Sequence, residues 1–179
     1  DDFSFRPKNK IYLHSFSKKL CGRSRKDHFA GVVNVVNRFL EIVKPKYIFL
    51  GLKDFQQMYL IKSHIEKNNI KTKVVSCKTV RETNGVACST RNNNLGKKEL
   101  FIASRVYAYL KNKKKLIKNN IKKINLLKFS EDIKKIGAKK IDYIDFFCTK
   151  TLKKTNSKDR NFRLFIAYYI NKIRLIDNL

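Results

Sequence analysis

The sequence predicts an α/β fold in its first part, followed by a small α+β part. Two apolar runs, residues 47–50 and 72–77, are typical of buried strands, and residues 55–67 between them carry apolar side chains at helical spacing. A strand, a helix and a strand in this order form a βαβ unit with a right-handed crossover. Further along, three β-prone runs predict a small antiparallel sheet with helices on one side: 141–147, 162–170 and 173–176.

The chain of 179 residues is long enough for one domain or two small ones. A single βαβ unit cannot bury both faces of its sheet, so we expect further strands upstream. The first residues, Asp1-Asp2-Phe3, are neither a start methionine nor part of a signal peptide. This favours a chain that begins partway into a longer protein. No apolar run approaches the roughly eighteen residues of a membrane span.

The cysteines and histidines predict no metal site. Cys21, Cys77, Cys88 and Cys148 lie far apart, form no Cys-x-x-Cys pair, and have no histidine near them at metal-ligand spacing. Reduced thiols in a cytoplasmic protein are the default interpretation.

The formal net charge of +28 has two interpretations. One is an anionic partner such as nucleic acid, a membrane surface or phosphorylated small molecules. The other is a lysine-rich surface spread over every solvated face. The excess is mostly lysine, is not confined to one segment, and accompanies no nucleic-acid-binding motif, so we favour the second interpretation.

The segment before the βαβ unit predicts a strand, a loop and a helix. Residues 9–16 alternate in polarity and favour a strand. Residues 18–29 form a cationic stretch without periodicity, whose arginines and histidine could clamp a carboxylate or phosphate, or could simply be solvated. From Gly31 to Lys44 the pattern is helical. The apolar face is predicted to contain Val32, Val36, Phe39 and Val43, with Val33 and Leu40 beside it.

The central stretch is Gly51-Leu52-Lys53-Asp54-Phe55-Gln56-Gln57, between the first strand and the helix, whose buried face is predicted to hold Phe55, Met58, Ile61 and Ile65. Gly51 would let the backbone approach a ligand without a Cβ in the way. Lys53 can neutralise phosphate, and Asp54 stands where a helix N-cap belongs. Ligands of such sheets bind beyond the carboxyl ends of the strands, which is where this stretch lies. The alternative is a plain strand-to-helix turn with a solvated lysine.

The second part begins with a hairpin signal. Asn84-Gly85 lies between two short β-prone runs and predicts a type I′ turn, which needs positive φ at both central residues. The hairpin leads into Cys88-Ser89-Thr90-Arg91-Asn92, whose hydroxyls and guanidinium can donate several hydrogen bonds to phosphate oxygens. The remaining predictions are a helix over 97–110, a solvated, lysine-dense helix end and linker over 111–123, a short helix over 127–136 and a polar, mobile loop over 150–160.

Together these motifs resemble the pantoate–β-alanine ligase (pantothenate synthetase) family. Residues 51–57 are similar to its Gly-Glu-Lys-Asp-Tyr-Gln-Gln stretch, and residues 80–92 to its Val-Arg-Glu…Asp-Gly-Leu-Ala-Leu-Ser-Ser-Arg-Asn stretch. Residues 22–32 resemble its Gly-x-Ser-Arg-Pro-Gly-His-Phe-x-Gly-Val loop, and residues 174–178 its Arg-Leu-Ile-Asp-Asn ending. Order and spacing agree from about residue 20 to the end.

The resemblance implies an ATP-dependent condensation of pantoate with β-alanine through a pantoyl adenylate, releasing pyrophosphate and then AMP. By motif match, Lys53, Ser89 and Arg91 would be catalytic. The ATP-binding residues would be Gly51, Leu52, Lys53, Asp54, Val80, Cys88, Ser89, Thr90 and Arg91. Within that set Asp54 would hold the ribose, Gly51 would approach the nucleotide, and the Val80 backbone would meet the adenine. Gln57 would orient pantoate, and Mg²⁺ would accompany ATP without a dedicated protein cage.

The resemblance also implies an architecture. Residues 1–79 would be the second half of a Rossmann-like nucleotidyl-transferase domain, and residues 80–179 a small α+β C-terminal lid domain. The protein would be a cytoplasmic homodimer. The family's His-x-Gly-His motif has no counterpart, so we expect the N-terminal half of the first domain to be absent from this sequence. Local departures are Leu52 for a glutamate, Lys26-Asp27 for Pro-Gly, and Lys78 for a proline.

Two other functions stay open at this level. One is a non-catalytic nucleic-acid-binding derivative of the fold, suggested by the net charge of +28 and the missing histidine motif. The other is a related nucleotidyltransferase that binds ATP but does not use pantoate.

Overall fold

The computed structural model describes residues 8–117, 125–155 and 161–179. The chain divides into two units, Asp1–Lys78 and Thr79–Leu179. The boundary predicted from the sequence lies one residue further on. Each unit is described by itself.

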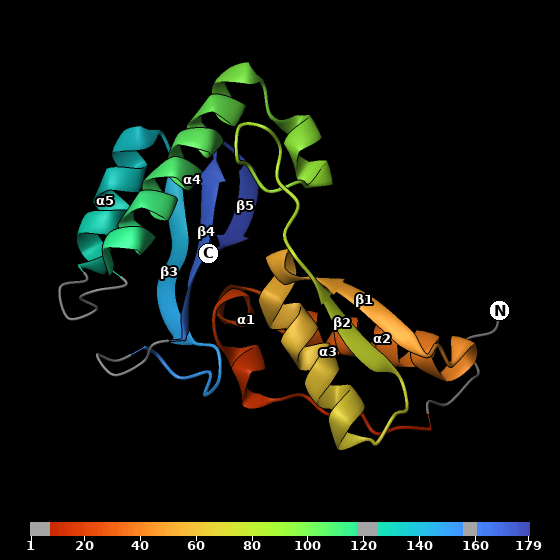
Figure 1. Cartoon of the computed structure of the whole chain (residues 1–179). Helices are drawn as coiled ribbons and strands as arrows, with labels where there is room; N and C mark the ends of the chain where they lie inside the picture. The colour runs from red at the N-terminus through yellow and green to blue at the C-terminus, as the bar shows by residue number, and fades with distance from the viewer. Residues whose placement is uncertain (1–7, 118–124, 156–160) are drawn as a thin grey trace. The chain divides into compact units, whose positions relative to one another are not determined.

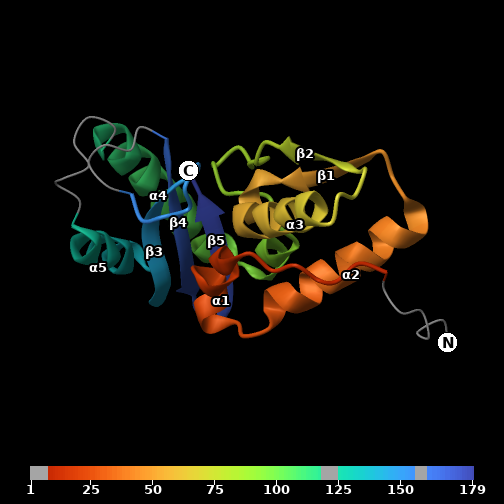
Figure 2. The same ribbon diagram turned by 90° about the horizontal axis from the view of Figure 1, so that it is seen from below.

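The first unit is built around a parallel strand pair. Its elements are the 3-10 helix η2 (Ser15–Lys18), α1 (Cys21–Ser24), α2 (His28–Val43), β1 (Tyr47–Gly51), the 3-10 helix η3 (Leu52–Asp54), α3 (Phe55–Lys67) and β2 (Lys73–Cys77). Strands β1 and β2 pair in parallel from Tyr47 opposite Lys73 to Gly51 opposite Cys77. Helix α3 connects them and lies along one face of the pair (Figures 1 and 2). The predicted βαβ unit is confirmed.

Helix α3 buries the predicted face, but α2 does not. Phe55, Met58, Ile61 and Ile65 are all at most 8% exposed. In α2 the buried residues are Phe29, Val33, Asn37 and Leu40, whereas Phe39 and Val43 are 60% and 65% exposed, so the predicted face is wrong. The helix is turned so that the polar Asn37 faces inward to a side-chain partner, which a count of apolar residues cannot detect.

The predicted strand over residues 9–16 is also wrong. Ser15–Lys18 forms the 3-10 helix η2, and the described residues before it pair with no strand. Their backbone is held by side chains instead: Glu41 accepts hydrogen bonds from the backbone N–H groups of Lys8 (3.2 Å) and Asn9 (3.0 Å). The backbone N–H of Tyr12 donates to Nδ1 of His64 at 3.1 Å. Residues 18–29, predicted to be a loop, contain the short helix α1.

Several large apolar side chains of the first unit are exposed. The exposed residues are Val35, Phe39, Ile42 and Val43 of α2 and Tyr47 and Phe49 of β1, the last being 67% exposed. Strands that continued the sheet would cover such side chains. That further strands adjoin this unit stays a prediction.

The second unit is an antiparallel sheet covered by helices on one face. Its elements are the 3-10 helix η4 (Thr90–Asn94), α4 (Lys97–Ile117), α5 (Leu126–Ile136), β3 (Lys140–Cys148), β4 (Phe162–Ile170) and β5 (Ile173–Asn178). The strand order is β3-β4-β5, and α4 and α5 lie side by side on the sheet (Figure 1). The core between the helices and the sheet includes the buried side chains of Val106, Leu110, Ile133, Leu164 and Ile166. The predicted sheet and helices are confirmed.

The predicted hairpin forms, but with a different turn. Arg81 and Ala87 form an antiparallel bridge, and the backbone N–H of Gly85 donates to the carbonyl of Glu82 at 2.8 Å. Gly85 has a φ of 86°, whereas Asn84 is not among the residues with positive φ, so the turn is not type I′. The loop has three residues, because Glu82 N–H bonds to Val86 O at 2.9 Å, and such loops need only one left-handed residue.

Two predicted segments lie only partly within the described residues. Helix α4 continues to Ile117, so the predicted helix end lies beyond Leu110 as expected. Residues 118–123 of the predicted linker and residues 156–160 of the predicted polar loop lie outside the described residues. None of the described helices combines the length and the apolar character needed to cross a membrane.

Candidate functional site

The stretch from Gly51 to Gln57 lies where β1 gives way to α3. Gly51 ends the strand with an extended backbone (φ −71°, ψ 132°), and a Cβ built there meets no atom within 4 Å. The backbone is therefore open to a neighbouring molecule at this point. Leu52–Asp54 makes one 3-10 turn, and α3 begins at Phe55. These groups stand at the carboxyl end of a parallel strand, the edge at which α/β sheets bind ligands.

Lys53 and Asp54 face each other loosely. The Lys53 Nζ atom lies 3.8 Å from Asp54 Oδ2, and the two side chains are 19% and 46% exposed. A half-exposed ion pair of this length is weak, so an anionic ligand can compete for the ammonium group. Asp54 occupies the N-cap position of α3, but its side chain makes no capping hydrogen bond. Its carboxylate is thus not committed to the helix.

The two glutamines that follow differ in environment. Gln57 is half-buried, whereas Gln56 is 6% exposed. The Gln56 Oε1 atom accepts from the backbone N–H of Cys21 at 3.1 Å, and its Nε2 donates to the carbonyls of Phe16 (2.8 Å) and Lys19 (2.7 Å). Gln56 therefore fixes the segment that precedes α2. The sequence pattern did not single it out, because its partners lie 35 to 40 residues away.

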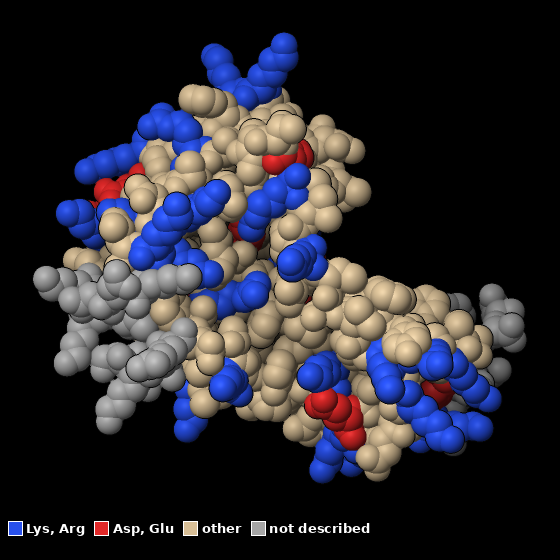
Figure 3. Space-filling model, viewed as in Figure 1, with Lys and Arg blue, Asp and Glu red and all other residues tan. Residues whose placement is uncertain are grey.

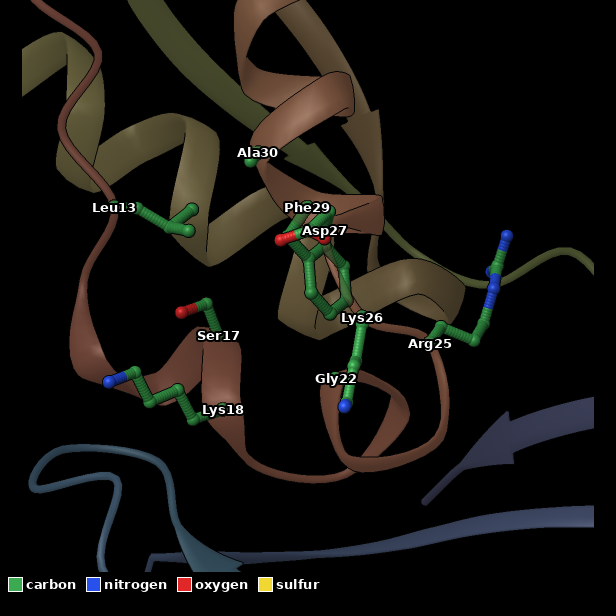
Figure 4. Close-up of a pocket in the computed structure, with 9 residues that line it drawn as sticks. All are labelled: Leu13, Ser17, Lys18, Gly22, Arg25, Lys26, Asp27, Phe29 and Ala30. Atoms are coloured by element: carbon green, nitrogen blue, oxygen red, sulfur yellow. The ribbon is translucent and has the colours of Figure 1, made fainter.

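The cationic segment between η2 and α2 lines a cavity of about 260 Å³. Lys18, Arg25 and Lys26 border it, but Figure 4 shows their side chains directed away from one another. Gly22 packs so tightly against the backbone that an added Cβ would lie 1.6 Å from the Ser17 carbonyl oxygen. The arrangement favours solvated charges over the anion clamp considered from the sequence.

In the second unit, the hairpin delivers Cys88, Ser89, Thr90 and Arg91 to the start of η4. The backbone N–H of Cys88 donates to the Val80 carbonyl at 3.0 Å, which holds the two residues side by side. Ser89 caps η4, since its Oγ accepts from the Arg91 N–H at 3.3 Å. Thr90 and Arg91 are exposed, and Val80 is 71% exposed. A hydroxyl that accepts one bond still has its own proton to donate to an anion.

The predicted site residues thus fall into two sets. Gly51, Leu52, Lys53, Asp54 and Gln57 are contiguous in the first unit. The second set comprises Val80, Cys88, Ser89, Thr90 and Arg91 in the second unit. Among the described residues no three His, Cys, Asp or Glu side chains gather in a way that could hold a metal ion.

The charge is spread over both units. In the view of Figure 3, Lys and Arg side chains are scattered over the surfaces of both units, and Asp and Glu side chains are few. The basic residues do not gather into one patch on this face. This favours the interpretation of +28 as a general property of the surface.

A parallel βαβ unit with a lysine just after its first strand, together with a hydroxyl-rich cationic turn, is typical of an α/β protein that binds phosphate-bearing ligands. The comparison with known families is specific. The model of the family described as pantoate–β-alanine ligase matches residues 2–179, and the chain belongs to this family.

Several relatives are similar over nearly the whole chain. The pantothenate synthetase of Clostridium botulinum (strain Loch Maree) is 36% identical over 176 residues, which cover 95% of this chain and 63% of the relative. That of Thermosipho melanesiensis is 38% identical over 166 residues, covering 91% and 59%. This chain therefore spans about three fifths of the length of these relatives.

Solved structures agree. A crystal structure of pantoate–β-alanine ligase from Francisella tularensis, complexed with beta-gamma ATP and β-alanine, has a TM-score of 0.73 and 35% identity, covering 94% of this chain and 56% of that one. Pantothenate synthetase from Thermus thermophilus has a TM-score of 0.79 and 25% identity, covering 95% and 62%. The resemblance of residues 20–179 to this family is thereby confirmed.

Proposed function

We propose that the protein to which this chain belongs condenses pantoate with β-alanine, using ATP, to give pantothenate, AMP and pyrophosphate. The observation that carries the proposal is the family match over residues 2–179, which includes both candidate anion-binding segments. The Francisella relative, which is complexed with beta-gamma ATP and β-alanine, supports the same substrates here.

The reaction has two balanced steps. In the first, a pantoate carboxylate oxygen bonds to the α-phosphorus of ATP, and the bond from that phosphorus to the bridging oxygen breaks, releasing pyrophosphate. In the second, the β-alanine amine bonds to the acyl carbon of the adenylate, AMP leaves with the carboxylate oxygen, and the new amide nitrogen loses a proton. Both steps gather negative charge on oxygens, which cationic side chains and N–H groups stabilise.

Lys53 has the position for the first step. It stands at the carboxyl end of β1, its side chain is mostly buried, and its pair with Asp54 at 3.8 Å is loose. We assign it to the charge that develops on the transferring phosphate. Asp54, whose carboxylate makes no cap, is assigned to the ribose, and the open backbone at Gly51 and Leu52 to close approach of the nucleotide. Gln57 is assigned to pantoate.

The second unit supplies the other donors. Ser89, Thr90 and Arg91 are assigned to the remaining phosphate oxygens, and their turn is fixed by the Ser89 cap. Val80 and Cys88, which share a backbone hydrogen bond, are assigned to the adenine side of the nucleotide. Residues 1–79 would then be part of the nucleotide-binding domain, and residues 80–179 the C-terminal lid domain.

The finer features follow the family. We propose that Mg²⁺ arrives bound to the phosphate oxygens of ATP, the way in which proteins commonly take this ion. We also propose a homodimer that works in the cytoplasm.

The test is pantoate-dependent exchange of pyrophosphate into ATP, measured on protein from the complete reading frame. Lys53→Ala is expected to abolish exchange while its circular dichroism stays that of the wild type. Lys62→Ala is the matched control, because Lys62 lies on α3 and forms an exposed pair with Glu66 at 3.7 Å. Exchange that survives Lys53→Ala, or that proceeds without pantoate, would contradict the proposal.

A further inference from the structure

Resting on the proposed function, we infer that Arg81 and Asp177 are positioning residues, whose ion pair holds the Cys88–Arg91 segment in the shape that binds the phosphates of ATP. Neither residue belongs to that segment.

Arg81 and Asp177 form a bidentate ion pair. Arg81 Nη1 lies 2.7 Å from Asp177 Oδ2, and Nη2 lies 2.9 Å from Oδ1. The side chains are only 20% and 10% exposed. A bidentate pair of guanidinium and carboxylate fixes the relative orientation of the two groups as well as their distance. It therefore ties the first strand of the hairpin to β5 in one defined geometry.

The same guanidinium also holds the hairpin turn. Arg81 Nη1 donates to the Gly85 carbonyl at 3.1 Å, and its Cζ lies 4.2 Å from the centre of the Tyr107 ring of α4. Gly85 passes so close to that ring that a Cβ would lie 2.4 Å from Tyr107 Cδ1. Burial alone would lower the pKa of Arg81, but the hydrogen bonds and charge of Asp177 outweigh it and raise that pKa. The hairpin is thus pinned between α4 and β5.

A second set of hydrogen bonds connects the hairpin to Asn92, which directly follows the segment. Asn92, which is 7% exposed, donates through Nδ2 to Glu82 Oε1 (2.6 Å) and to the Ala87 carbonyl (3.1 Å). Arg81 and Glu82 are neighbours, so the pinned hairpin and Asn92 bracket residues 88–91. Cys88, Thr90 and Arg91 are exposed and Ser89 is half-buried, so the conformation of the segment depends largely on these flanks.

Strand β5 also reaches the segment directly. Arg91 Nη1 donates to the Arg174 carbonyl at 3.4 Å. Arg174 is in turn fixed by Asp142, with Nη2 2.7 Å and Nε 3.0 Å from Oδ2. Asp177 and Arg174 therefore fix the hairpin and Arg91 from one rigid strand. Loss of the Asp177 charge would let the hairpin shift relative to β5 and move the phosphate donors out of place.

The test uses Asp177→Asn and Arg81→Lys in the complete protein, with pantoate-dependent ATP–pyrophosphate exchange as the readout. Each variant is expected to lower kcat/KM for ATP by about tenfold to a hundredfold, the order that a 1 Å displacement of reacting groups costs. The KM for ATP is expected to rise while the KM for pantoate stays at the wild-type value. A general loss of folded protein would instead lower kcat and leave both KM values unchanged. Arg81→Lys keeps the positive charge beside Asp177 but cannot form the bidentate pair. It therefore tests the bidentate geometry if Asp177→Asn folds poorly.

Asp132→Asn is the matched control. It removes the negative charge of the carboxylate that accepts the Tyr109 hydroxyl hydrogen bond (2.7 Å) between α5 and α4, in the same unit but away from the segment. It is expected to lower stability without changing kcat/KM for ATP. Wild-type kcat/KM for ATP in folded Arg81→Lys or Asp177→Asn would overturn the inference alone. Absence of pantoate-dependent exchange in the wild type would overturn the proposed function and, with it, this inference.

Discussion

The Nε2 atom of His64 lies 2.9 Å from Oδ1 of Asn37, and both side chains are completely buried. Nδ1 of the same ring accepts the Tyr12 backbone N–H, so Nδ1 carries no proton and Nε2 donates to Asn37. The hydrogen-bond chain continues to Glu41, because Asn37 Nδ2 donates to Glu41 Oε1 at 2.9 Å. The imidazole is therefore a neutral link between α3, α2 and the chain segment before η2.

Acid should weaken the first unit through this link. Burial lowers the pKa of His64 from 6.5, and the nearby charge of Glu41 only partly opposes that shift. A histidine with a lowered pKa in the fold binds its proton more readily when unfolded, so its stabilisation is present above 6.5 and lost as pH falls below that value. Urea unfolding at a series of pH values should show this decline in the wild type.

His64→Gln provides the comparison. It should lower the free energy of unfolding by about 1–3 kcal/mol at neutral pH, because buried hydrogen-bonding groups lose their partner. It should also flatten the decline just below 6.5, leaving the loss due to Glu41, whose pKa is lowered from 4.5. Burial would raise the Glu41 pKa, but hydrogen bonds from Asn9, Asn37 and Lys8 outweigh it. An unchanged pH profile in the variant would contradict the role of His64.

Gln56→Ala should loosen the segment before α2. The substitution removes three hydrogen bonds, two of them buried, and leaves the Phe16 and Lys19 carbonyls without this donor, at a cost of about 2–3 kcal/mol. The amide of Cys21, which donates to Gln56, should exchange its hydrogen much faster. Gln57→Ala, at the half-buried neighbour, should leave that exchange rate unaltered. An equal hydrogen-exchange rate of the Cys21 amide in both variants would contradict this role of Gln56.

Gly22→Ala and Gly31→Ala should act in opposite directions. A Cβ at Gly22 would lie 1.6 Å from the Ser17 carbonyl oxygen, so the backbone must move, and a loss of about 3 kcal/mol is expected. At Gly31, inside α2, a Cβ meets nothing within 4 Å, and alanine should stabilise by about 0.5–1 kcal/mol. Thermal unfolding of the two variants measures both signs. A Gly22→Ala protein as stable as the wild type would refute the close approach.

Asn125→Ala should weaken the start of α5. The Asn125 side chain accepts from the Lys128 N–H at 3.0 Å and caps the helix. Its removal should cost about 0.5–2 kcal/mol, whereas Asn125→Asp keeps an acceptor and should cost little. Equal losses for the two substitutions in urea unfolding would show that capping is not the cause.

The parts of the fold that follow from local pattern were predictable. The βαβ unit and the antiparallel sheet follow from apolar runs and helical periods. The α2 face was predicted wrongly because the inward position belongs to Asn37, whose burial depends on a histidine 27 residues away. Residues 9–16 alternate like a strand, but their backbone is satisfied by Glu41 and His64 rather than by a neighbouring strand.

The candidate site divides in the same way. Lys53, Asp54 and Ser89–Arg91 could be proposed from motifs, because the residues assigned to the chemistry are contiguous in the sequence. Their supports could not, since Arg81 meets Asp177 across 96 residues and Gln56 meets Phe16 across 40. The turn at Asn84-Gly85 was found, but its type depends on the loop length set by the Arg81–Ala87 bridge.

The exposed apolar side chains of α2 and β1 mean that the surplus of lysine affects how the polypeptide behaves in solution. A polypeptide of residues 1–179 carries side chains such as Phe39 and Phe49 in the open, together with a formal net charge of +28. In dilute buffer, mutual repulsion keeps such molecules apart. Added salt shortens the range of that repulsion and leaves the attraction between apolar surfaces in place. The polypeptide is therefore best handled at low ionic strength, and salting should bring on self-association.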